Sequence, residues 1–104
     1  VYKGMDSQIK LIDFGLAKIC KSSESRMRTK SGSAYYIAPE VLAGDYNLKW
    51  DVWGLGAILF VMIVGYPPFN GDNDAQIYNA IQNDEPDFVA EDWEGISPAC
   101  ISLI

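Results

Sequence analysis

A continuous apolar run at residues 52–64 limits what this chain can fold into more than any other feature of its sequence. It contains large hydrophobic side chains with two glycines, Gly54 and Gly56. As an α-helix it would be about 20 Å long, which is shorter than the roughly 30 Å hydrocarbon core of a bilayer. The sequence therefore predicts no membrane span but a helix buried on all sides inside a protein lobe, and Gly65 is expected to end it.

Local signals predict further helices on either side of this run. Pro39 can begin a short helix that stops at Gly44. Apolar residues at i, i+3 and i+4 predict a helix over residues 74–83 with one apolar face. Ser97 followed by Pro98 is typical of the start of another helix.

The first part of the chain looks different. Residues 9–12 are rich in β-branched side chains and follow a turn-like segment, so they predict a short strand. Residues 18–30 are polar and basic without periodicity, which indicates a loop. Loops of this length are usually functional or disordered.

Charge is divided unevenly along the chain. Eight basic and five acidic residues lie at or before Lys49, a net charge of +3, whereas nine acids and no bases follow it, a net charge of −9. We interpret the acidic half as a solvated surface. Nucleic-acid binding is disfavoured, because neutralising phosphates requires an extended basic surface.

The two cysteines, Cys20 and Cys100, match no metal-ligand spacing, and the chain contains no histidine to complete a zinc site. Neither a signal peptide nor a disulfide pattern is recognisable. We therefore expect reduced thiols in an intracellular, cytoplasmic protein.

Several short motifs occur in a fixed order. Asp13-Phe14-Gly15 alone is compatible with a plain turn, but Ala38-Pro39-Glu40 closes a segment of 28 residues that begins at Asp13. Protein kinases place their activation segment between these same two motifs. Two further motifs follow: Asp51-Val52-Trp53-Gly54 and Gly65-Tyr66-Pro67-Pro68-Phe69.

On these motifs the whole chain resembles the protein kinase superfamily, serine/threonine type, and most of all the calcium/calmodulin-dependent and calcium-dependent protein kinases. The resemblance implies an α+β protein-kinase fold in which residues 1–104 form part of the domain. This part would be the mostly helical C-terminal lobe, with a short β segment and the activation loop at its start. The nucleotide-binding N-lobe and the catalytic loop are expected to lie before it.

The resemblance also assigns roles to residues. Asp13 would bind Mg²⁺, for which a carboxylate is a suitable hard ligand. Phe14 and Gly15 would form the activation switch, since glycine gives the backbone the freedom to change conformation. No catalytic base is expected within the chain.

A second group of residues would form the substrate-docking loop: Gly32, Ser33 and Tyr36. Tyrosine kinases typically carry a proline in this loop, so the hydroxyl of Ser33 favours serine/threonine specificity. Glu40 and Asp51 would be structural, Asp51 as a buried aspartate that needs hydrogen-bond partners.

Thr29, with Ser31 as the second choice, is a candidate phosphorylation site in the basic loop. A phosphate there adds roughly −1.5 to −2 of charge among cations and can order the loop. The alternative is a solvated basic loop without a switch. Calcium-dependent kinases commonly carry an acidic residue near this place, so Thr29 favours an upstream activating kinase over direct calcium control.

The expected activity is transfer of the ATP γ-phosphate to serine or threonine hydroxyls of protein substrates, with ATP and Mg²⁺ as cofactors. A calcium-sensor domain or calmodulin is a further expected partner. The 104 residues alone are expected to be inactive. The alternative function is that of a pseudokinase acting as a scaffolding or binding module.

Overall fold

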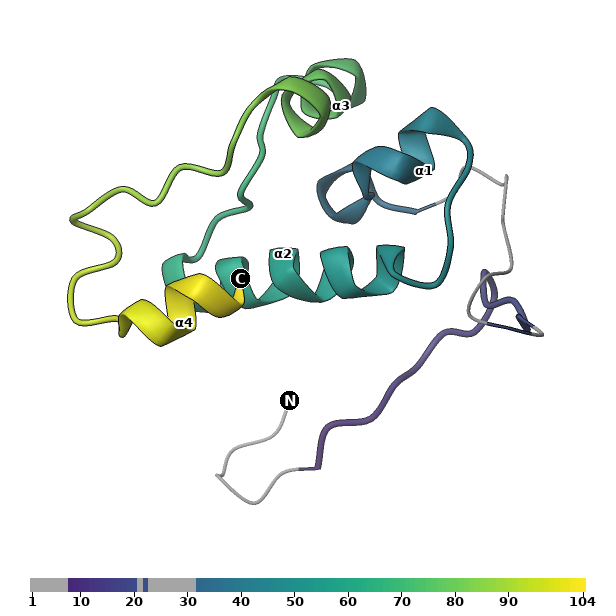
Figure 1. Cartoon of the computed structure of the whole chain (residues 1–104), viewed down its shortest axis with the longest axis horizontal. Coiled ribbons are helices and arrows are strands. Elements are labelled where there is room, and N and C mark those ends of the chain that lie inside the picture. The colour runs from purple at the N-terminus through teal and green to yellow at the C-terminus, as the bar shows by residue number, and fades with distance from the viewer. Residues whose placement is uncertain (1–7, 21, 23–31) are drawn as a thin grey trace.

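The computed structural model describes residues 8–20, 22 and 32–104. In this part of the chain the regular elements are all helical (Figure 1): a 3-10 helix η1 (Ala34–Tyr36) and the α-helices α1 (Pro39–Ala43), α2 (Trp50–Val64), α3 (Asp74–Asn83) and α4 (Pro98–Leu103). The prediction of a mostly helical lobe is confirmed. None of these helices is long and apolar enough to cross a membrane.

The helix ends follow the local signals in the sequence. Gly44 and Gly65 end α1 and α2 with φ values of 85° and 87°, a left-handed conformation that glycine adopts without steric cost. Ser97 caps α4, since its hydroxyl accepts a hydrogen bond from the Cys100 amide at 3.2 Å. The predicted bounds of α3 are confirmed, and α2 begins two residues before the apolar run.

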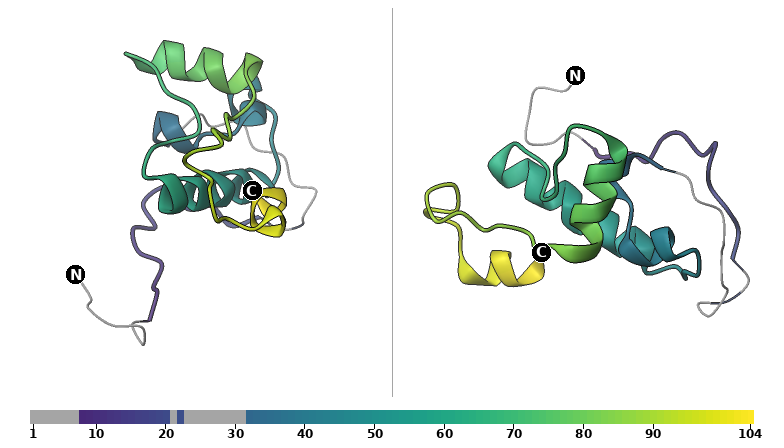
Figure 2. Two further views of the ribbon diagram at one scale, coloured as in Figure 1. Left: turned by 90° about the vertical axis from the view of Figure 1, so that its left-hand side faces the viewer. Right: turned by 90° about the horizontal axis from the view of Figure 1, so that it is seen from above.

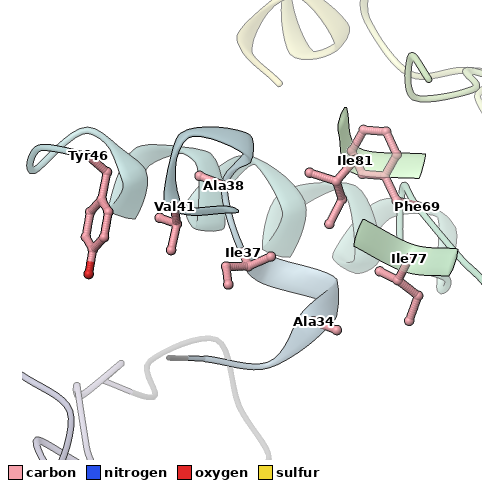
Figure 3. Packing of buried hydrophobic residues seen from close by; sticks show 8 residues of the cluster. All are labelled: Ala34, Ile37, Ala38, Val41, Tyr46, Phe69, Ile77 and Ile81. Atoms are coloured by element: carbon pink, nitrogen blue, oxygen red, sulfur yellow. The ribbon is translucent and has the colours of Figure 1, made fainter. Parts of the chain in front are cut away.

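The main core lies where η1 and α1 meet α3 and the long helix α2 (Figures 1 and 2). It contains the apolar face predicted for α3, with Ile77 and Ile81 buried against Phe69 (Figure 3). The Phe69 ring stacks on that of Trp53 from α2, with ring centroids 5.8 Å apart. This packing joins α2 to α3 through the loop between them.

A second, aromatic cluster packs around Phe60, which is only 1% exposed. The ring of Phe60 makes edge contacts with Tyr66, Phe88 and Trp93 at centroid distances between 5.2 and 5.8 Å. These contacts hold the irregular segment before α4 against the C-terminal half of α2.

One expectation is wrong. Residues 9–12 form no strand, and the side chains of Ile9 and Ile12 are 95% and 83% exposed. A strand needs a hydrogen-bonding neighbour, and no described segment pairs with these residues. Helix α2 exposes Val52, Leu55 and Met62, so these residues alone do not cover it on all sides, and its burial in a larger lobe stays a prediction.

Candidate functional site

A tight turn follows Asp13. The amide of Ala17 donates a hydrogen bond to the Phe14 carbonyl at 3.0 Å, and the Gly15 amide donates to Oδ1 of Asp13 at 3.3 Å. Asp13 has a φ of 61°, a conformation that aspartate tolerates because its short side chain bonds to the nearby backbone. The Asp13 carboxylate and the Phe14 ring are both exposed.

A second turn surrounds Ser33. Gly32 has a φ of 134°, which is strained for any residue with a Cβ. Ser33 is extended, and its carbonyl accepts a hydrogen bond from the Tyr36 amide at 3.1 Å. The Ser33 hydroxyl does not cap η1 and its side chain is exposed, so the hydroxyl faces water.

The chain after Ser33 is fixed to the helical core. Ile37 and Ala38 are buried, and Ala38 is completely inaccessible. The carbonyl of Tyr36 lies against Gly54 of α2, where a Cβ built on the glycine would be 3.6 Å from that oxygen. This anchoring holds the Ser33 turn at a defined place beside α2.

Glu40 lies in the first turn of α1, where a carboxylate is favourable to the helix dipole. It is half-buried and lines a cavity of about 650 Å³ along α2. The other lining side chains are mostly apolar and include Trp53, Leu55, Phe69 and Leu103.

Comparison with known proteins decides the family. Residues 2–104 match the family described as "Protein kinase domain". The chain belongs to the protein kinase family. It is 43% identical over 102 residues to "Calcium-dependent protein kinase 22" of Oryza sativa subsp. japonica, a match that covers 98% of this chain and 18% of the relative.

Two other relatives come from Plasmodium species. "Calcium-dependent protein kinase 3" of Plasmodium yoelii yoelii is 39% identical over 102 residues, covering 98% of this chain and 19% of the relative. "Calcium-dependent protein kinase 5" of Plasmodium berghei (strain Anka) is 40% identical over 99 residues, covering 95% of this chain and 17% of the relative. The chain therefore spans less than a fifth of the length of these relatives.

The kinase motifs are only partly brought together. Ser33, Tyr36 and Glu40 belong to one compact unit with η1, α1 and α2. Asp13 and Phe14 lie on an exposed segment and do not pack against the helical core. Thr29 and Ser31 lie outside the residues that the structure describes.

Protein kinases use Mg²⁺ with ATP. A magnesium ion prefers several oxygen ligands in octahedral geometry, of which the protein usually supplies one or two carboxylates. Within residues 8–20, 22 and 32–104, no three acidic or other metal-ligating side chains come together. These residues therefore do not form a complete metal site by themselves.

Asp51 lies in the first turn of α2 and is exposed. Its carboxylate is compatible with the positive end of the helix dipole. The catalytic loop expected to cover it is not among these residues, so its structural role stays a prediction.

Sequence reasoning missed the hydrogen bond from the Tyr66 hydroxyl to Oδ2 of Asp92, at 2.6 Å. This bond raises the pKa of Tyr66 above its ordinary value of 10.0, and partial desolvation and the negative charges of Asp92 and Asp87 add to the effect. The two residues are 26 positions apart, and no local pattern pairs them.

Proposed function

We propose that this chain is part of the catalytic domain of a serine/threonine protein kinase, and that the complete domain transfers the ATP γ-phosphate to protein hydroxyls. The supporting observation is that one continuous family match carries Asp13-Phe14-Gly15, Ser33 and Ala38-Pro39-Glu40 in order. We assign the chain to the large lobe, with the nucleotide lobe and the catalytic loop outside it.

Phosphoryl transfer depends on positioning and on neutralising the charge of the phosphates. When bound, Mg²⁺ supplies that neutralisation, and Asp13 is the residue of this chain that would hold it. The Gly15 amide donates to Oδ1 of Asp13, and the carboxylate is exposed, so its other oxygen is accessible to a cation. Phe14 and Gly15 would switch this arrangement on and off.

The Ser33 turn would receive the substrate. Its exposed hydroxyl and its backbone anchor on α2 support the docking role, together with Gly32 and Tyr36. A rigid support matters because correct placement of the reacting groups supplies a large share of the catalytic effect. Glu40 and Asp51 would stabilise the lobe and take no part in the chemistry.

The test uses the intact protein with radioactive ATP and a pair of peptides that differ only in a serine or a tyrosine acceptor. We expect transfer to serine and none to tyrosine. Replacing Asp13→Asn should reduce kcat to less than about a tenth, since losing a charge-stabilising group costs several kcal/mol. The matched control Asp72→Asn removes an exposed acid elsewhere and should leave kcat unchanged.

Two results would overturn the assignment. If wild-type protein with a verified fold transfers no phosphate even when it is phosphorylated at Thr29 or Ser31 and supplied with calcium, the pseudokinase alternative holds. If the Asp13→Asn variant retains most of its kcat, Asp13 is not the metal ligand.

We further propose that activity depends on a phosphate at Thr29 or Ser31, supplied by an upstream kinase. The relatives are named calcium-dependent, so calcium is the competing form of control. Assays with calcium and with a calcium chelator, before and after phosphatase treatment, separate the two. Sensitivity to phosphatase alone supports the phosphate switch, whereas sensitivity to the chelator alone contradicts it. A cytoplasmic location suits such a kinase and stays a prediction.

A further inference from the structure

The loop between α2 and α3 contains an asparagine followed by glycine. The sequence has five asparagines, and Asn70 is the one whose next residue is glycine. Asn70 is exposed, so water and hydroxide reach its side chain. Gly71 has no Cβ, so no side chain of its own hinders the approach of its amide nitrogen to the Asn70 side chain.

The side chain of Asn70 already lies on that amide. The Gly71 amide donates a hydrogen bond to Oδ1 of Asn70 at 2.9 Å. The carbon Cγ is one C=O bond, about 1.2 Å, from this oxygen. The nitrogen of Gly71 and the amide carbon of Asn70 are therefore held close together in the folded protein.

The other four asparagines are arranged differently. Oδ1 of Asn47 accepts from the Lys49 amide at 2.9 Å, and Oδ1 of Asn73 accepts from the Gln76 amide at 3.1 Å. Asn79 and Asn83 are linked to each other through their side chains inside α3. In none of these interactions does the side chain contact the amide of the next residue.

We propose that Asn70 is a site of spontaneous deamidation in the folded protein. Hydroxide removes the Gly71 amide proton and the nitrogen forms a bond to Cγ of Asn70. The Cγ–Nδ2 bond then breaks as Nδ2 takes a proton from water and leaves as ammonia. Water then opens the five-membered succinimide at one of its two carbonyl groups, giving aspartate or isoaspartate. No oxidant or reductant is needed, and the site is independent of the proposed kinase activity.

The two products differ in their effect on α3. Aspartate adds a negative charge at an exposed position and leaves the backbone path unchanged. Isoaspartate lengthens the backbone beside Gly71, which already packs so tightly that a Cβ there would lie 2.7 Å from Cβ of Gln76. Gln76 also accepts the Asp72 amide hydrogen bond at 2.8 Å, so isoaspartate would disturb the start of α3.

The test is to age the intact folded protein at mildly alkaline pH and to map its peptides by mass spectrometry, with isoaspartate detected by enzymatic methylation. We expect deamidation at Asn70 to be faster by an order of magnitude or more than at Asn47, Asn73, Asn79 and Asn83. Asn70→Gln is the matched control, because its longer side chain does not close a five-membered ring, and it should abolish the modification.

A second measurement separates the folded geometry from the bare sequence. The same mapping in concentrated urea gives the rate for the unfolded chain. A folded rate equal to or above the unfolded rate supports the proposal, and a folded rate an order of magnitude below it overturns the proposal. Hydrogen exchange in α3 should rise in the isoaspartate fraction and stay unchanged in Asn70→Asp; equal exchange in the two would overturn the proposed effect on α3.

Discussion

At the scale of single residues, the glycines of this chain differ in what a side chain would meet. A Cβ on Gly71 would lie 2.7 Å from Cβ of Gln76 and 3.0 Å from the Ile77 nitrogen, whereas a Cβ on Gly54 would lie 3.6 Å from the Tyr36 carbonyl oxygen. The first distance is a clash and the second is an ordinary contact. Substitution by alanine should therefore have different effects on stability at the two positions.

We expect Gly71→Ala to destabilise the intact protein by about 1–3 kcal/mol, because the methyl group overpacks the start of α3. Gly54→Ala should be neutral or stabilising by up to about 1 kcal/mol, since alanine favours a helix interior. Urea unfolding of both variants measures the difference. Equal stability of the two variants would contradict the close packing at Gly71.

The hydrogen bond between Tyr66 and Asp92 predicts a pH dependence. It holds the proton on Tyr66 in the folded state, so the pKa is raised above 10.0 there. The stabilisation by this bond is complete below the pKa of the unfolded chain and is lost as pH rises through the higher folded pKa.

Near-ultraviolet tyrosinate absorbance, with Tyr66→Phe to assign the signal, measures this titration. Asp92→Asn should lower the pKa of Tyr66. Glu91→Gln removes a neighbouring exposed acid without touching the bond and should change the pKa little. An unchanged pKa in Asp92→Asn would show that the bond does not form in solution.

At the scale of elements, the start of α3 depends on its capping residue. Oδ1 of Asn73 accepts the Gln76 amide, which satisfies a donor that the helix itself leaves unpaired. Asn73→Ala should cost about 1 kcal/mol, within the range of 0.5–2 for such caps. Gln82→Ala, at an exposed position in the same helix, should change stability by only a few tenths of a kcal/mol. If the two variants unfold at the same urea concentration, the cap contributes nothing.

The helices were predictable because their signals are local. Pro39 and Gly44 bound α1, the period of 3.6 marks α3, and Ser97 begins α4, all within a few neighbouring residues. The cap at Asn73 had a signal too, since Gln76 follows three positions later as in a capping box. Tyr66 and Asp92 meet only after the chain has folded, and their contact could not be predicted.

The strand predicted at residues 9–12 shows that a local signal can be insufficient. Its β-branched side chains fit a strand, but a strand forms only against a partner, which the described residues do not supply. Similarly, the motifs around Asp13 and Ser33 were recognisable in order, yet the full surroundings of Asp13 depend on groups far from it in sequence. The motifs therefore indicate candidate site residues. They do not show which of these residues lie close together in the folded chain of 104 residues.

At the scale of the whole molecule, the radius of gyration is 15.4 Å, larger than the roughly 13 Å of a compact domain of about 100 residues. Residues 8–20 run as an extended segment away from the helices (Figures 1 and 2), and α2 leaves Val52, Leu55, Ile58 and Met62 exposed. Burying such a side chain contributes on the order of 1.5–3 kcal/mol. Four of them together rival the 5–15 kcal/mol that typically stabilises a domain.

We therefore expect the isolated 104-residue chain to fold poorly and to associate. The stacking of Trp53 on Phe69 and the cluster around Phe60 oppose this by giving the helices a small core of their own. Sedimentation measures whether the chain associates, and a thermal scan monitored by circular dichroism measures whether it unfolds cooperatively. Replacing Ile58→Lys and Met62→Lys together places charge on the exposed face and should reduce association without entering the core. A sharp cooperative transition from a wild-type monomer would show that the two clusters suffice, and the argument from the exposed face of α2 would then be wrong.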